Sequence, residues 1–173
     1  DERGDLSQHV DGYQRRDLPY DILVGGPLLE ELPPMPIPEE TVWAIETLIY
    51  TYAERVDLGD FDGAGEVFAH GGRRHGAEGT LLSGPALAEA LRGSFRLHDG
   101  RPRTKHCTTN VLIEVDEDAG NATARSYFTV TQATAGLPLQ VIAAGRYHDV
   151  FERVAGIWRF HLRTIHLDHE GVL

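Results

Sequence analysis

Three side chains in this sequence could together move a proton: Tyr52, Asp57 and His106. A carboxylate that accepts a hydrogen bond from one imidazole nitrogen leaves the other nitrogen free to take a proton, and it stabilises the resulting imidazolium. If the fold brings Asp57 to His106 at the mouth of an apolar pocket, the two form a general base. The alternative is a structural histidine satisfied by hydrogen bonds, with Asp57 in solvent at a helix end.

The spacing of the acid and the tyrosine limits how they can act together. Five residues cover about 500° of α-helix, so Tyr52 and Asp57 point about 140° apart. Both can face one pocket only if the helix ends near Asp57, and Gly59 is a natural stop. Tyr52 then either donates a hydrogen bond to a substrate oxygen or packs in the core.

Four further residues are candidates for the same site. Asn110 follows His106 by four residues, so strict alternation puts both on one strand face, where Asn110 could hold a substrate oxygen or a neighbouring backbone. Trp43 and Tyr127 are candidate substrate contacts. Arg163 alternates with the apolar residues of its strand, so it points outward unless a bulge, or an inward-facing polar side, turns it into the pocket.

Helices are predicted in the first half of the domain. Pro38 or Glu39 starts the first, and apolar residues then recur at three- and four-residue steps up to Gly59. Asp60 caps a short second helix over 61–68, and Ser83 precedes a third. The glycine-rich stretch 70–80 is expected to be a strand or a loop that leads across the sheet.

The second half of the chain predicts a sheet. Alternating runs at 106–115, 123–132, 141–153 and 157–167 are joined by turns, with a loop at 133–138, which indicates an antiparallel meander. Helices followed by strands indicate an α+β domain whose helices cover one face of a curved sheet. The proline-rich stretch 1–37 predicts an extended N-terminal arm, with a disordered tail as the alternative, and 38–173 the folded domain.

Composition narrows the function classes. The chain has 173 residues and a formal net charge of −11, which disfavours nucleic acids and anionic membranes as partners. One cysteine, Cys107, allows no intrachain disulfide, and no apolar run approaches the ~20 residues of a membrane span. We therefore expect a cytoplasmic protein. The histidine spacing does not favour a metal site, and 71–74 lacks the ending of a phosphate-binding loop.

Two patterns in the sequence resemble a known family. The helix ending Tyr52-x4-Asp57-x-Gly-Asp60 and the strand opening His106-x2-Thr109-Asn110 resemble the SnoaL-like branch of the NTF2-like superfamily. The strands that contain Gly145-Arg-Tyr-His-Asp149 and Trp158-Arg-Phe160-x2-Arg163 are similar too. The similarity covers about residues 38–167.

The resemblance implies a cone-shaped α+β barrel, in which a bent antiparallel sheet wraps the long first helix and a deep apolar pocket opens at the wide end. Members such as bile acid and scytalone dehydratases and a lindane dehydrochlorinase use an Asp–His pair there. In this sequence the pair corresponds to Asp57 and His106, the dehydratase tyrosine to Tyr52, and an arginine of the last strand to Arg163.

The function expected from this resemblance is a cofactor-independent lyase, of dehydratase type, that acts on a small apolar or polycyclic substrate. An isomerase or a polyketide cyclase would use the same proton abstraction, and a non-catalytic ligand-binding or oligomerisation module is the third alternative. A homo-oligomer, trimer or dimer, is expected because the outer sheet face carries apolar residues.

The first residues also invite a hypothesis about the origin of the chain. It begins with Asp1 rather than Met, so its N-terminus is expected to be processed, trimmed or left out. Gly4-Asp-Leu-Ser-Gln-His9 is similar to a motif that often ends members of the family, which suggests either chance or a piece of a tandem fusion.

Overall fold

The computed structural model of this protein describes residues 37–171. The chain divides into two units, Asp1–Pro36 and Ile37–Leu173, and everything below concerns the described part of the second. Apart from Ile37, the predicted N-terminal arm lies outside the described residues, as does the motif at residues 4–9.

The first helix, α1 (Glu39–Leu58), has the boundaries that its sequence predicts. Glu39 and Glu40 stand in its first turn, where carboxylates suit the positive end of the helix dipole. Gly59 ends the helix with a left-handed φ of 77°, a conformation that costs glycine little. The stop therefore falls two residues after Asp57.

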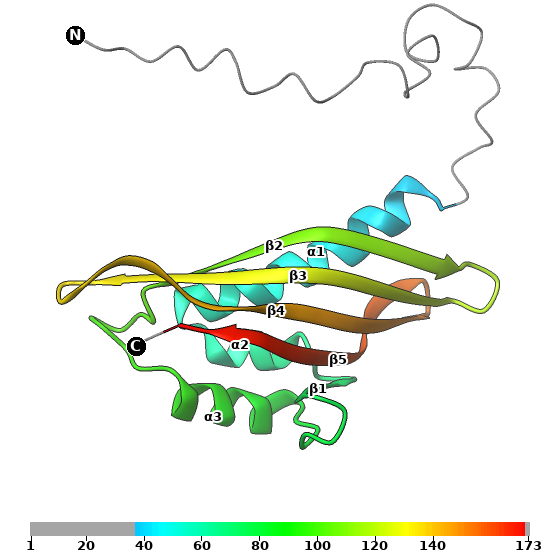
Figure 1. Cartoon of the computed structure of the whole chain (residues 1–173). Coiled ribbons are helices and arrows are strands. Elements are labelled where there is room, and N and C mark those ends of the chain that lie inside the picture. Colours follow the sequence, from blue (N-terminus) through cyan, green and yellow to red (C-terminus); the bar gives the residue numbers. More distant parts are fainter. Residues whose placement is uncertain (1–36, 172–173) are drawn as a thin grey trace, which may run out of the picture. The chain divides into compact units, whose positions relative to one another are not determined.

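Two shorter helices follow. In α2 (Phe61–Glu66) the Asp60 carboxylate accepts a hydrogen bond from the Gly63 amide, and the helix ends two residues earlier than predicted. The third helix, α3 (Gly84–Ser94), begins with a proline in its first turn. Figure 1 shows α1 crossing the sheet.

The sheet has five strands in the order β1-β5-β4-β3-β2. Strands β2 (Thr104–Asp116), β3 (Asn121–Thr134), β4 (Leu137–Val154) and β5 (Ile157–Glu170) form the predicted antiparallel meander, which is visible from green to red in Figure 1. The stretch predicted as strand or loop contains β1 (Gly72–His75), which pairs in parallel with β5. The loop predicted at 133–138 is shorter, a turn at 135–136, because β3 and β4 continue into it and pair up to Thr134 and Leu137.

The helices and the inner face of the sheet share one apolar core. Ile45, Ile49 and Val56 of α1 pack with Phe68, Phe151 and Phe160 in its main cluster. A second cluster on the same sheet face consists of Phe128, Val130, Tyr147 and Ile165, with Ile142 and Ala143 packed against it. These contacts fit the predicted α+β class.

Two of the register shifts in the sheet decide which side chains face the core. Between Thr109 and Leu112 the register of β2 against β3 shifts, and Asn110 adopts a φ of 53°. Between Val150 and Phe151 the register of β4 against β5 shifts, with His161 as the extra residue, so that Phe160 and Arg163 are both fully buried. The bulge therefore turns Arg163 inward, and the outward orientation expected from simple alternation is wrong.

Arg163 is paired inside the core. Its Nε and Nη2 donate to Oδ1 and Oδ2 of Asp149 at 2.8 Å and 2.7 Å, and both side chains have no exposed surface. Its guanidinium lies 4.0 Å from the centre of the Tyr147 ring and 5.1 Å from that of Tyr52. A planar, bidentate pair between aromatic rings satisfies most of the donors that burial would otherwise leave without water.

Breaking this pair should destabilise the fold. We expect Asp149→Asn to lower the free energy of unfolding by about 3–5 kcal/mol, because it leaves the Arg163 charge buried without a counter-charge. Chemical denaturation would measure the change. The matched control is Asp168→Asn, since Arg146 and Asp168 form the same bidentate pair between β4 and β5 in solvent, at 2.8 Å for both contacts. Equal losses in the two variants would contradict the prediction.

Candidate functional site

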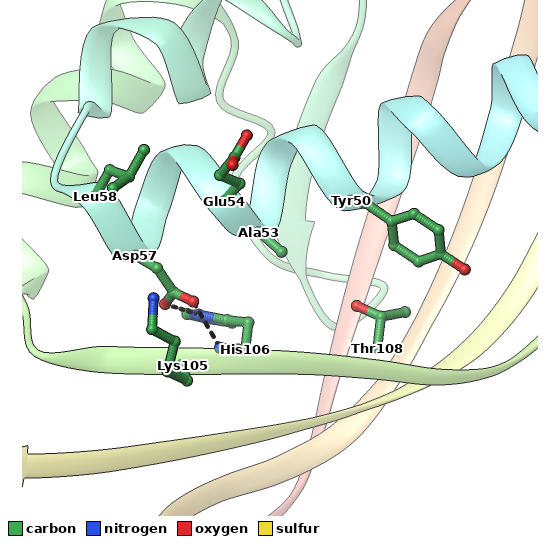
Figure 2. Close-up of a pocket in the computed structure, with 8 residues that line it drawn as sticks. All are labelled: Tyr50, Ala53, Glu54, Asp57, Leu58, Lys105, His106 and Thr108. Carbon is green, nitrogen blue, oxygen red and sulfur yellow. Dashed lines mark hydrogen bonds and ion pairs between the residues drawn. The ribbon is translucent and has the colours of Figure 1, made fainter.

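The structure brings Asp57 and His106 into direct contact. Nδ1 of His106 lies 2.6 Å from Oδ1 of Asp57, and the backbone N–H of His106 donates to Oδ2 at 2.8 Å. A carboxylate can only accept, so Nδ1 carries the proton and Nε2 is the basic nitrogen. Figure 2 shows the Asp57 carboxylate pointing from α1 to His106 on β2. The two side chains are 7% and 9% exposed, which shields their interaction from water.

A third donor completes the surroundings of Asp57. The Thr104 hydroxyl donates to Oδ1 at 2.7 Å. Burial raises the pKa of Asp57, but the hydrogen bonds from His106 and Thr104 outweigh it and hold the pKa below its usual value. Asp57 is therefore ionised at neutral pH, and it fixes both the tautomer and the orientation of the imidazole.

A pocket of about 280 Å³ opens beside the pair (Figure 2). Its walls mix apolar and charged side chains from α1 and β2, so it differs from the purely apolar pocket that the sequence predicts. Besides the pair, it is lined by Tyr50, Ala53, Glu54, Leu58, Lys105 and Thr108.

A larger pocket of about 670 Å³ lies on the other side of Thr104. It is bounded by the end of α3, the β3–β4 hairpin and the end of β5, and Ile142 and Ala143 connect its wall to the second apolar cluster. Thr104 lines this pocket and also donates to Asp57, so one residue joins the larger pocket to the pair.

Tyr52 and Arg163 lie deeper in the domain than the pair. Tyr52 is 3% exposed, and its ring packs edge-on against Phe68 as well as facing Arg163. At 1.5 Å per residue, Tyr52 is about 7.5 Å along the helix axis from Asp57. Neither Tyr52 nor Arg163 lines either pocket, since both are enclosed by the core.

The other three predicted site residues lie away from the pair. Trp43 is 72% exposed and stands about four turns before Asp57 on α1. The bulge turns the Asn110 side chain to the opposite face of β2 from His106. The prediction that these two residues share a strand face is therefore wrong. Asn110 and Tyr127 instead line a separate surface pocket of about 270 Å³ together with Arg146 and His148.

Thr104 is a site residue that the sequence reasoning did not single out. It precedes His106 by two residues, so strand alternation alone puts it on the same face. Its hydroxyl could have been recognised as a donor to the carboxylate by that spacing. Within the described residues, no group of three or more potential metal ligands is found, and no helix is long and apolar enough to cross a bilayer.

Solved structures share this fold. Rv3472 from Mycobacterium tuberculosis, a protein of unknown function, is 28% identical with a TM-score of 0.62, over 83% of this chain and 77% of that one. Aln2 from a Streptomyces species is 28% identical with a TM-score of 0.62, over 76% and 94%. A putative scytalone dehydratase from Novosphingobium aromaticivorans is 20% identical with a TM-score of 0.59, over 78% and 89%, which shows the fold alone.

Other structures with this fold are described as cystatin-like or NTF2-like. No curated protein matches the chain. A family model does: the model of the SnoaL-like domain matches residues 40–164, a range that includes Asp57, His106 and Arg163. The chain therefore belongs to the SnoaL-like domain family, with the α+β fold of the NTF2-like proteins.

Proposed function

We propose that this protein is a cofactor-independent lyase that eliminates water or a halide from a small apolar substrate. The observation that carries the proposal is the buried contact between Asp57 and His106, 2.6 Å from oxygen to nitrogen. An ionised carboxylate held on Nδ1 makes Nε2 a base and stabilises the imidazolium formed when it accepts a proton.

In the proposed step, Nε2 of His106 takes a proton from a carbon next to a carbonyl. The electron pair of the broken C–H bond forms the alkene, and the bond to the leaving group breaks. The leaving group departs as hydroxide, which takes the proton back from the imidazolium to give water, or as halide, in which case the imidazolium releases its proton to solvent. No redox change occurs, so the step needs no cofactor.

Tyr52 and Arg163 receive different roles in this proposal. Tyr52 keeps the role expected from the sequence, a hydrogen bond to the oxygen that gains charge or departs, which requires the substrate to reach past the pocket wall to a side chain that is 3% exposed. Arg163 is a positioning residue, because it is fully covered and contacts the Tyr52 ring instead of a pocket. Trp43, Asn110 and Tyr127 have no part in the proposed step.

The larger pocket has room for a small substrate, and its lining mixes apolar side chains such as Phe95 and Ile142 with polar ones such as Arg96. Its volume of about 670 Å³ is in the usual range for small-molecule sites, and it meets the pair at Thr104. The name of the putative scytalone dehydratase agrees with an elimination, although that likeness concerns the fold. An isomerase or a cyclase would start from the same proton abstraction and would differ in its product.

Replacing either member of the Asp57–His106 pair should slow turnover strongly. On apolar β-hydroxy and β-halo carbonyl compounds, we expect His106→Ala and Asp57→Asn each to slow alkene formation by roughly 10²- to 10⁴-fold, the usual contribution of a general base. Ultraviolet absorbance would follow the conjugated product, and proton NMR in D₂O would detect exchange at the carbon next to the carbonyl.

The control for this experiment is His161→Ala, because His161 is 62% exposed and lies on β5, away from the pair. Its turnover should equal that of the unchanged protein. Unchanged turnover in both His106→Ala and Asp57→Asn would end the proposal. Compounds that bind to the unchanged protein without product or exchange would favour the non-catalytic binding module.

The lowered pKa of Asp57 predicts an acid-dependent stability. A carboxyl whose pKa is lower in the folded state stabilises the fold above its unfolded pKa, about 3.9 for Asp, and loses that contribution as the pH falls through the folded value. Asp57→Asn should therefore reduce the free energy of unfolding by roughly 1–3 kcal/mol at pH 7, with a smaller difference below about pH 4.

Urea denaturation at several pH values would measure this difference. Asp118→Asn serves as the control, since Asp118 is exposed in the turn between β2 and β3. A difference between Asp57→Asn and the unchanged protein that stays constant from pH 7 to acid would contradict the prediction, because linkage requires it to shrink.

A further inference from the structure

The larger pocket has a basic rim, although the chain as a whole is acidic. The segment that leads from the end of α3 into β2 contains one acid, Asp99, and four basic residues, Arg96, Arg101, Arg103 and Lys105. The net charge of the whole chain is −11. Arg103 is paired with Asp99 at 3.0 Å, and the other three form no ion pair among residues 37–171. Such a local excess of positive charge attracts anions.

One of these basic side chains, Arg96, lines the pocket of about 670 Å³. Phe95 ends α3 and stacks on Phe61 of α2 with 5.7 Å between the ring centres, so the backbone is anchored directly before Arg96. Figure 1 shows the segment after α3 at the same end of the sheet as the β3–β4 hairpin and the end of β5. Arg96 is exposed, so its guanidinium can meet a ligand that enters from solvent.

The rest of the pocket is largely suited to an apolar body. Leu137, Ile142 and Ala143 contribute apolar side chains to its lining. His98 also lines it and is half-buried, and its backbone is held to that of Arg101 by hydrogen bonds of 2.7 Å and 3.2 Å. In a pocket of this kind, a few polar groups fix the orientation of the ligand.

The pocket also has an acidic side chain, Glu170 at the end of β5. Glu170 is exposed, and within the described part of the chain it forms no ion pair with Arg96. The charge of Arg96 is therefore available to a ligand. Repulsion by Glu170 favours an anionic group on the α3 side of the pocket over the β5 side.

We propose that the substrate is an organic acid whose carboxylate is bound by Arg96. A guanidinium and a carboxylate are both planar and can form two parallel hydrogen bonds, and His98 offers a further donor. The apolar body of the acid fills the pocket, and its other end points toward Thr104, which joins this pocket to the Asp57–His106 pair.

This inference rests on the proposed function and names its substrate class. The carboxylate at Arg96 is not the carbonyl that activates the reacting carbon, since its negative charge opposes a second one on the neighbouring atom. The substrate therefore carries a carboxylate at one end and the reacting carbonyl at the other. Arg96 is a specificity residue, because it holds the end of the substrate that does not react.

The test compares two probes of nearly equal size on the full chain. 2-Naphthoate carries a carboxylate, 2-naphthamide is its neutral counterpart, and neither has a group that can be eliminated. We expect 2-naphthoate to bind roughly tenfold more tightly than the amide, the usual contribution of a hydrogen bond between charged groups. In Arg96→Gln this preference should disappear, with the affinity for the amide unchanged. Isothermal titration calorimetry would measure both affinities.

Three further variants make the result specific. Arg101→Gln changes the net charge by the same amount, but Arg101 does not line the pocket, so the preference should stay. Glu170→Gln removes the negative charge from the pocket and should not weaken the binding of 2-naphthoate. Arg96→Lys keeps the charge but loses the planar donor pair, so it should keep part of the preference.

Three outcomes would overturn the inference: equal affinity for the two probes, equal losses in Arg96→Gln and Arg101→Gln, or no saturable binding of either probe. The result is independent of catalysis, so His106→Ala should keep the preference for 2-naphthoate. Unchanged turnover in His106→Ala and Asp57→Asn, together with a preference that Arg96→Gln removes, would end the elimination and leave a pocket that binds organic acids.

Discussion

The carboxylate of Asp57 is the interaction on which the rest of the site depends. It accepts from the Thr104 hydroxyl, the His106 backbone and the His106 ring, and so it ties the end of α1 to the start of β2. Asp57 can reach β2 because the helix stops at Gly59 and the strand opens at Thr104. An ionised group that is 8% exposed is tolerated only because these donors replace water.

Small departures from regular strands decide which polar side chains join the core. One extra residue in β5 turns Arg163 toward Asp149, and the irregularity in β2 turns Asn110 away from His106. Each change reverses the face expected from alternation, since the side chains of a strand repeat every two residues. The same fold could thus exchange an inward arginine for an outward one by a single insertion.

Local signals were enough to predict α1 and the meander, because Pro38, Gly59 and the alternating runs act over a few residues. The contact between Asp57 and His106 was expected mainly from the family resemblance, since local patterns left a structural histidine equally open. The pairing of β1 with β5 and the bulges beside Asn110 and Arg163 depend on contacts between distant strands, which local patterns do not contain. Trp43 and Tyr127 were expected as substrate contacts, yet both are mainly exposed. The homo-oligomer and the cytoplasmic location stay predictions.

The two buried polar groups of this domain differ in what they can offer a ligand. The Asp57 carboxylate accepts from Thr104 and from the backbone and ring of His106, so the position left open on the imidazole is Nε2, which can accept a proton. Around Arg163 the carboxylate is fully used and donors remain, so that region can only donate hydrogen bonds. One polar cluster can thus accept a proton and the other can donate hydrogen bonds, and the Tyr52 ring of α1, which faces Arg163, lies between them.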